Sequence, residues 1–223
     1  EYSIGLTEAD EKIICRSALI PPKLKHTING HGAVMSTIFL EAGSIHFNYL
    51  NNKPSEKAQG IKYNFTETAL WARQINSLYQ GDNICAMGVT SLLENIFPTL
   101  ETKDSPSPLV DDRIHAAIHY IQNTTSDQLD ISSIVKLTKL SEYRLRHLFK
   151  ESTSISIGRY HIWQKLRRAV NGIEKGYNLT DAAIDAGFYD LAQMSKHFKA
   201  CLGLAPSQIF NQQEELVLFT IEL

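Results

Sequence analysis

The chain has 223 residues, a length that fits one large domain or two small ones. Its 43% hydrophobic and 21% charged residues are an ordinary globular mixture, which excludes a disordered chain and a coiled coil. The formal net charge of -2 hides an asymmetry, because residues 113–210 carry 13 Lys/Arg and 8 Asp/Glu whereas residues 1–112 carry 9 and 13. This asymmetry indicates that the C-terminal part meets an anion.

Cysteines, histidines and motifs argue against an enzyme. The three cysteines, Cys15, Cys85 and Cys201, form no CxxC pair, which is typical of a protein in a reducing cytosol. Cys201 is expected to be buried. No GxSxG, P-loop or HExxH motif is present, so we expect no catalytic residue, no metal and no cofactor. His115 and His119 have i, i+4 spacing without a third ligand, which favours an exposed helix face. No apolar run is long enough to cross a bilayer, so we expect no membrane partner.

The N-terminal part is predicted to be β-rich, from residue 1 to about residue 52. Its apolar runs are separated by prolines and turn residues, and they cover Ile13–Ile20, Leu24–Ile28 and Ala33–Leu40. The chain opens without methionine in the strand-like segment EYSIGL, so we expect that part of this domain precedes residue 1.

Helical spacing then appears over residues 66–80 and over residues 83–96. Trp71 and Tyr79 fit the core or a dimer face, and the core is favoured. The polar residues 49–60 are predicted to form a loop, and the proline- and serine-containing residues 99–109 a linker. The resulting division is a domain at 1–100, a linker at 101–110, a second domain at 111–210 and a tail at 211–223.

The second domain is predicted to be helical and to contain a repeat. A short helix at Ile131–Leu137, a turn and a helix capped by Ser141 are typical of a helix-turn-helix. After a longer helix at Ile157–Lys175, the pattern recurs 49 residues on, with Thr180 as cap of the short helix and Asp190 opening the next one. A connecting helix of about 19 residues is about 28 Å long. That length suits two recognition helices one DNA turn apart, about 34 Å.

Positions in both helix-turn-helix units match a known pattern. The second unit has Ala182-Ala183, Ala186-Gly187-Phe188, Phe198-Lys199 and Gly203-Leu204-Ala205-Pro206-Ser207. The first has Leu140-Ser141, Leu148-Phe149-Lys150, Thr153, Ser156 and Tyr160. From about Arg113 to Phe210 the chain therefore resembles the DNA-binding domain of the AraC/XylS family of bacterial transcription regulators. The segment from Leu19 to Gly43 resembles the second half of the cupin-like sensor domain found in some of them.

This resemblance implies an α+β protein. A partial cupin-like β domain with helices would precede an all-α domain of two helix-turn-helix units joined by a long helix. The implied function is sequence-specific DNA binding by a cytoplasmic regulator, an activator, with double-stranded DNA and RNA polymerase as partners. The N-terminal domain would bind a small-molecule effector, form a homodimer, or do both.

The resemblance also assigns DNA-contacting positions. The base-facing side chains would be Tyr143, Arg146, His147, Leu191, Ala192, Gln193, Ser195 and Lys196. Arg146 has the chemistry to bind guanine and Gln193 that to bind adenine, each through two hydrogen bonds, whereas Leu191 and Ala192 offer only apolar contact, for instance to a thymine methyl. The phosphate contacts would be Ser141, Arg144, Lys150 and Lys199.

Some interpretations stay open at this stage. Arg167 and Arg168 fit phosphate contact, and they fit equally well the solvated face of the connecting helix or packing between the two helix-turn-helix units. Lys139 and Ser154 stand where relatives usually have glycine, and with the apolar Leu191-Ala192 they keep a second function open, a regulator that acts by binding a partner protein. A third interpretation is a cupin-type metalloenzyme fused to a helical domain.

Overall fold

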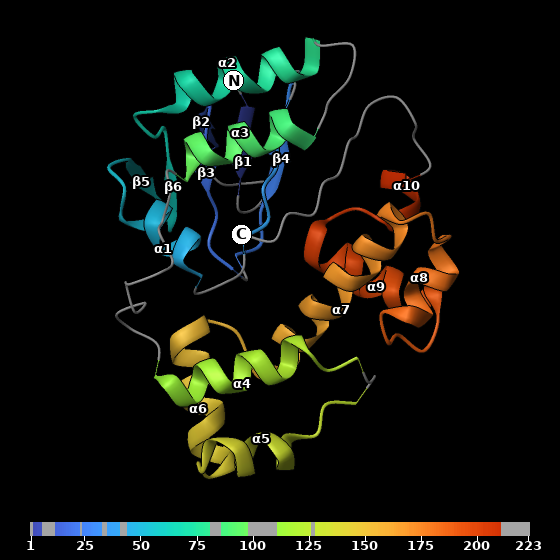
Figure 1. Ribbon diagram of the computed structural model, residues 1–223. Coiled ribbons are helices and arrows are strands. Elements are labelled where there is room, and N and C mark those ends of the chain that lie inside the picture. Colours follow the sequence, from blue (N-terminus) through green and yellow to red (C-terminus); the bar gives the residue numbers. More distant parts are fainter. Residues whose placement is uncertain are drawn as a thin grey trace. The chain divides into compact units, whose positions relative to one another are not determined.

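The structure is a computed structural model that describes residues 2–5, 12–22, 24–32, 35–40, 44–80, 86–97, 111–125 and 128–210. The chain divides into two compact units, Glu1–Pro108 and Leu109–Leu223 (Figure 1). The predicted linker at 101–110 and the predicted tail at 211–223 lie outside the described residues. Among the described helices, none is both long and apolar enough to span a membrane.

Two small antiparallel sheets build the β part of the first unit. One has the order β2-β1-β4, made of Ile13–Cys15, Tyr2–Gly5 and Thr27–Asn29. The other has the order β3-β6-β5, made of Ala18–Leu19, Ile61–Tyr63 and Glu56–Ala58. The two-residue loop between β5 and β6 holds Gln59 and Gly60 at φ 52° and 84°, and positive φ at both positions suits the twist of a tight hairpin.

Side-chain alternation explains how the first sheet is packed. In β2, Ile13 and Cys15 are buried whereas Ile14 is 66% exposed, which is the two-residue period of a strand with one covered face. Ile13 and Cys15 join Ile4 and Ile61 in a small core that includes residues from both sheets. This unit is thus a β structure with a modest core, consistent with the predicted α+β class.

Three helices complete the first unit: α1 at Ile45–Asn52, α2 at Thr68–Gln80 and α3 at Ala86–Ile96. Helix α2 packs on α3. The buried Trp71 of α2 lies against Phe65, with ring centroids 5.8 Å apart, so its prediction as a core residue is confirmed. Tyr79 is 53% exposed, and its prediction as a core residue is wrong.

Several predictions for the first unit fail for physical reasons. Residues 35–40 of the predicted strand Ala33–Leu40 have no regular structure, because an apolar run forms a strand only where another strand pairs with it; residues 33–34 are not described. Residues 45–52 form a helix rather than a strand, since the Ser44 side chain accepts the Phe47 N–H at 3.1 Å and caps it. The predicted loop at 49–60 contains the end of α1 and the strand β5.

The second unit is helical over its described residues. Its helices are α4 at Asp112–Gln122, α5 at Ile131–Thr138, α6 at Glu142–Thr153, α7 at Ile157–Glu174, α8 at Leu179–Asp185, α9 at Leu191–Leu202 and α10 at Pro206–Phe210. Helix α7 is shared: it contacts α4 and α6 on one side of the repeat, and α8 and α9 on the other (Figure 1). The predicted order of helices is confirmed.

Each half of this unit has its own core. In the first, the buried face of α4 meets Phe149 of α6 and Tyr160 of α7, whose rings pack edge to face at 5.4 Å. In the second, Leu166 and Ala169 of α7 meet Met194 and Phe198 of α9. The predicted inward positions Leu145, Phe149, Met194 and Phe198 are all fully buried.

Two local predictions in the second unit are wrong. Asn178, rather than Thr180, caps α8, because its side-chain oxygen accepts the N–H groups of both Thr180 and Asp181 at 3.0 and 2.9 Å. Cys201, expected to be buried, is exposed, although surrounding protein atoms raise the pKa of its thiol. A raised pKa leaves less of the reactive thiolate.

Candidate nucleic-acid interface

The first helix-turn-helix consists of α5, the three residues 139–141 and α6. Lys139 ends α5 in the left-handed conformation at φ 54°, and Leu140 buries its side chain in the turn. Ser141 then accepts the backbone N–H of Arg144 at 3.3 Å, so its predicted role as the cap of α6 is confirmed. Lys139 therefore adopts the backbone conformation that a glycine would supply, and the turn is kept.

The second helix-turn-helix consists of α8, its turn and α9. Gly187 takes φ 87° in the turn, and the buried Phe188 donates its N–H to the Ala183 carbonyl at 2.9 Å. Asp190 caps α9 by accepting the Gln193 N–H at 2.6 Å, as the sequence predicts. The Gln193 side-chain oxygen in turn accepts the Tyr189 N–H at 2.9 Å, so the start of α9 is fixed from both directions.

The outward face of α6 is polar, cationic and aromatic. Tyr143 is 81% exposed, and the predicted contacts Arg144, Arg146, His147 and Lys150 are exposed as well. The Arg146 guanidinium donates through Nε and Nη2 to Glu142 Oε1, at 2.9 and 2.7 Å, and this holds it along the first turn of α6. These two bonds leave the Nη1 donors and the second Nη2 donor of the guanidinium for a planar acceptor pair.

The outward face of α9 is much less polar. Among the predicted residues, Ala192, Lys196 and Lys199 are exposed, whereas Leu191, Gln193 and Ser195 are half-buried. Leu191 also packs against the second core. The structure thus places all twelve predicted site residues on α6, on α9 or at the N-cap of α6. Contact of these residues with DNA stays a prediction.

Sequence reasoning missed Tyr189. It lies between Phe188 and the cap Asp190 and is 80% exposed, whereas Phe188 is buried in the turn, as Leu140 is in the first helix-turn-helix. The sequence held a signal for it, because Leu140 and its capping neighbour Ser141 are adjacent, whereas Tyr189 is an additional residue between Phe188 and the cap Asp190.

Phe188, in the turn before α9, is held between a side chain of α7 and a side chain of α9. The Lys165 ammonium lies 4.3 Å from the centroid of the Phe188 ring, and His197 stacks on the same ring at 6.2 Å. Burial, and after it the charges of Lys165 and Lys196, lower the pKa of His197. A neutral His197 can therefore pack beside two ammonium groups and hold α9 in place.

The contacts of Arg168 on α7 distinguish phosphate contact from packing within the chain. Its Nη1 donates to the Gln122 carbonyl at the end of α4, at 3.4 Å. Burial, and after it the charge of Arg167, lower its pKa, while Asp185 of α8 raises it. A half-buried guanidinium between α4 and α8 favours the packing role over phosphate contact.

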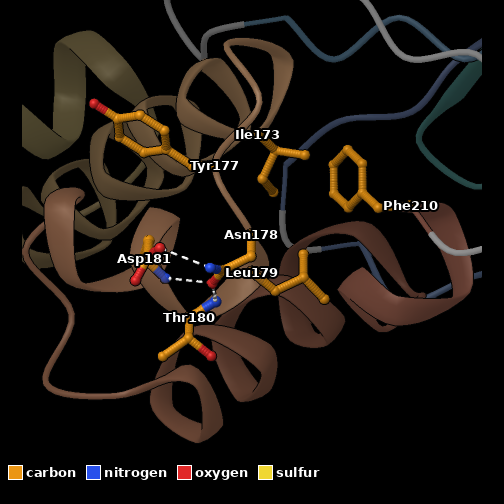
Figure 2. Close-up of a pocket in the computed structure, with 7 residues that line it drawn as sticks. All are labelled: Ile173, Tyr177, Asn178, Leu179, Thr180, Asp181 and Phe210. Carbon is orange, nitrogen blue, oxygen red and sulfur yellow. Dashed lines mark hydrogen bonds between the residues drawn. The ribbon is translucent and has the colours of Figure 1, made fainter.

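The described residues contain a shallow pocket near the end of α7 (Figure 2). Its apolar lining is formed by Ile173, Leu179 and Phe210. On its polar side, Asn178 donates to the Asp181 carboxylate at 2.6 Å and accepts from two backbone N–H groups. These polar groups already form hydrogen bonds in the cap of α8, so few of their donors and acceptors are left for a ligand. Within the described part of the chain, no three His, Cys, Asp or Glu side chains are grouped to hold a metal ion.

Comparison with known proteins agrees with this geometry. Residues 134–212 match the model of a family described as a helix-turn-helix domain. The chain is 30% identical over 116 residues to the arabinose operon regulatory protein of Escherichia coli K12, covering 51% of this chain and 40% of that protein. A second relative, from Salmonella typhimurium, is 30% identical over 107 residues. The chain thus spans well under half the length of these curated relatives.

Solved structures give weaker likenesses. The DNA-binding domain of AdpA, crystallised with a target DNA, has 19% identity and a TM-score of 0.40, and the match covers 44% of this chain and 89% of that one. Apo ToxT K231A of Vibrio cholerae has 11% identity and a TM-score of 0.48, over 93% and 83%.

Proposed function

We propose that this chain is a sequence-specific DNA-binding transcription regulator of AraC type, since its residues 134–212 match a helix-turn-helix family model and it is similar to the arabinose operon regulatory protein. Two features support the proposal. Two recognition helices, α6 and α9, stand on one shared helix of 18 residues, which is about 27 Å long. Both carry exposed cationic side chains, and the region 113–210 that contains them has five more Lys/Arg than Asp/Glu.

The single observation that carries the proposal is the pair of equivalent, capped helices. Ser141 and Asp190 cap α6 and α9 at positions 49 residues apart, and Phe149 and Phe198 anchor them in separate cores. Recognition helices held in this way are suited to successive major grooves, where base edges carry a distinct pattern of donors and acceptors. Activation, contact with RNA polymerase, effector binding and dimerisation by the first unit belong to the same proposal, as does action in the bacterial cytoplasm without catalysis.

Selection of bound duplexes from a random library, with the full chain at near-physiological salt, tests the proposal. We expect a motif of two short blocks about one helical turn apart. A folded chain that enriches nothing would refute DNA reading and leave the partner-binding alternative.

Arg146 provides the sharper test. Arg146→Ala should cost about 1–3 kcal/mol at one base position and relax the preference for guanine there. Arg146→Lys keeps the charge but loses the planar pair of donors, so it should relax the same position. If both variants weaken binding to every sequence equally, Arg146 contacts phosphate only. Lys175→Ala, at an exposed end of α7, is the matched control for loss of one charge.

A further inference from the structure

The two recognition helices present different chemistry at equivalent positions. With the 49-residue offset, Tyr143 corresponds to Ala192 and Arg146 to Ser195. Tyr143 and Arg146 are exposed and polar at their ends, whereas Ala192 exposes one methyl group and Ser195 is half-buried. Helix α9 therefore lacks the long hydrogen-bonding side chains that α6 offers at these two positions.

Gln193 does not compensate for this loss. Adenine recognition needs both the oxygen and the nitrogen of the carboxamide in one plane with the base edge. In this structure the oxygen accepts the Tyr189 N–H at 2.9 Å, while the Gln193 backbone N–H is bound by Asp190. Releasing the carboxamide would leave the Tyr189 N–H without that acceptor, so base binding by Gln193 competes with the cap of its own helix.

What remains near the start of α9 is apolar. Ala192 is exposed on the second residue of the helix, and Leu191 is half-buried with its inner side against the second core. The thymine C5 methyl is the apolar feature of a base edge in the major groove. Lys196 adds a point charge without bidentate geometry.

We propose that the second helix-turn-helix selects thymine through its C5 methyl, contacted by Ala192 and the edge of Leu191, while the first selects guanine through Arg146. The DNA site then has two chemically unlike blocks. This inference rests on the proposed function, and its test separates the two.

The test starts from the enriched site and replaces thymine by deoxyuracil, one block at a time. Deoxyuracil lacks only the C5 methyl, so base pairing and hydrogen bonding are retained. Burial of one methyl or methylene group corresponds to about fourfold in affinity. We expect each contacted thymine in the α9 block to cost about fourfold when replaced, and replacement in the α6 block to change affinity by less than twofold.

A variant connects the effect to the side chain. Ala192→Gly removes the exposed methyl from the protein and leaves only the edge of Leu191, so the preference of this variant for thymine over deoxyuracil should be smaller than that of the parent chain. Tyr143→Ala, at the equivalent position of α6, is the matched control and should keep the full thymine effect in the α9 block. Thermal unfolding followed by circular dichroism verifies that both variants remain folded, as expected for exposed positions.

Each outcome separates the two proposals. A thymine preference in the α9 block that deoxyuracil abolishes and Ala192→Gly reduces supports the inference. An enriched motif without that sensitivity, an adenine preference lost in Gln193→Ala, or a single block bound by α6 alone overturns it, while DNA reading stands. A library with no enrichment refutes the proposed function itself, and the inference with it.

Discussion

Replacing Lys139 by glycine should stabilise the second unit. Lys139 ends α5 at φ 54° and ψ 28°, in the left-handed region, where an L-residue costs about 1–2 kcal/mol. Its side chain is exposed, so little packing is lost with it. The equivalent turn of the second helix-turn-helix uses Gly187 at φ 87°, which shows that glycine fits this geometry.

The expected gain is smaller than the full strain. Glycine makes the unfolded chain more flexible, and this offsets about 0.4–1 kcal/mol of the relief. The net increase in the free energy of unfolding is therefore about 0.5–1 kcal/mol, or about 2–8 °C in Tm for a unit of this size. The chain has two tryptophans, Trp71 in the first unit and Trp163 in α7. Urea unfolding followed by fluorescence in a Trp71→Phe background therefore reports on the second unit alone.

Two controls separate conformation from charge. Lys139→Ala removes the ammonium group but keeps Cβ, and it should leave the free energy of unfolding near that of the parent. Gly203→Ala is the reverse test, because Gly203 has φ 84° and an added Cβ meets no atom within 4 Å. It should lower the free energy of unfolding through backbone strain alone. If the glycine and alanine variants at Lys139 are equally stable, the strain argument is refuted.

Three further predictions follow from single contacts. Gln193→Ala should lower the free energy of unfolding by about 0.5–1.5 kcal/mol through loss of the hydrogen bond from the Tyr189 N–H, whereas Arg144→Ala, at the equivalent position of α6, should change it by less than about 0.5 in urea titrations. Arg113 holds the pKa of Asp111 at about 2, below the ordinary 3.8, so its contribution to stability is complete above about pH 4 and is lost as the pH falls through about 2. Asp111→Asn should remove that dependence from acid unfolding followed by circular dichroism. Arg168→Met should leave the slope of log affinity against log salt unchanged, since loss of a phosphate contact would reduce it by about 0.9.

The helices of the second unit could be predicted because their signals are local. Apolar residues at helical spacing and the caps Ser141 and Asp190 lie within a few residues of the elements that they define. The sheets of the first unit depend on distant partners instead: the Asn64 N–H donates to the Ser17 carbonyl at 2.9 Å, across 47 residues. Strands of two to four residues carry too little pattern to predict such pairing.

For the candidate interface, the sequence predicts which side chains lie on α6 and α9 but not what they bind within the chain. Gln193 has the chemistry of an adenine ligand, yet its carboxamide oxygen is bound to the Tyr189 N–H. Arg146 is bound to Glu142, four residues before it. Both contacts follow known spacings, a capping pair and an i, i+4 ion pair, so the sequence contains the information to predict them.

The contrast between buried and exposed positions bears on the kind of DNA site to expect. Equivalent buried positions carry side chains of similar size in the two cores: Leu145 matches Met194, and Phe149 matches Phe198. Substitutions of buried residues that keep the side-chain volume change the free energy of unfolding little, whereas those that change the volume lower it. Exposed positions are not constrained by core packing, so packing does not explain why α6 has Tyr143 where α9 has Ala192. The binding partner of the two helices is then the remaining constraint on their exposed side chains. Two unlike outward faces on one chain fit a DNA site whose two blocks differ in sequence. A site that presented the same block to both helices would not require the two faces to differ.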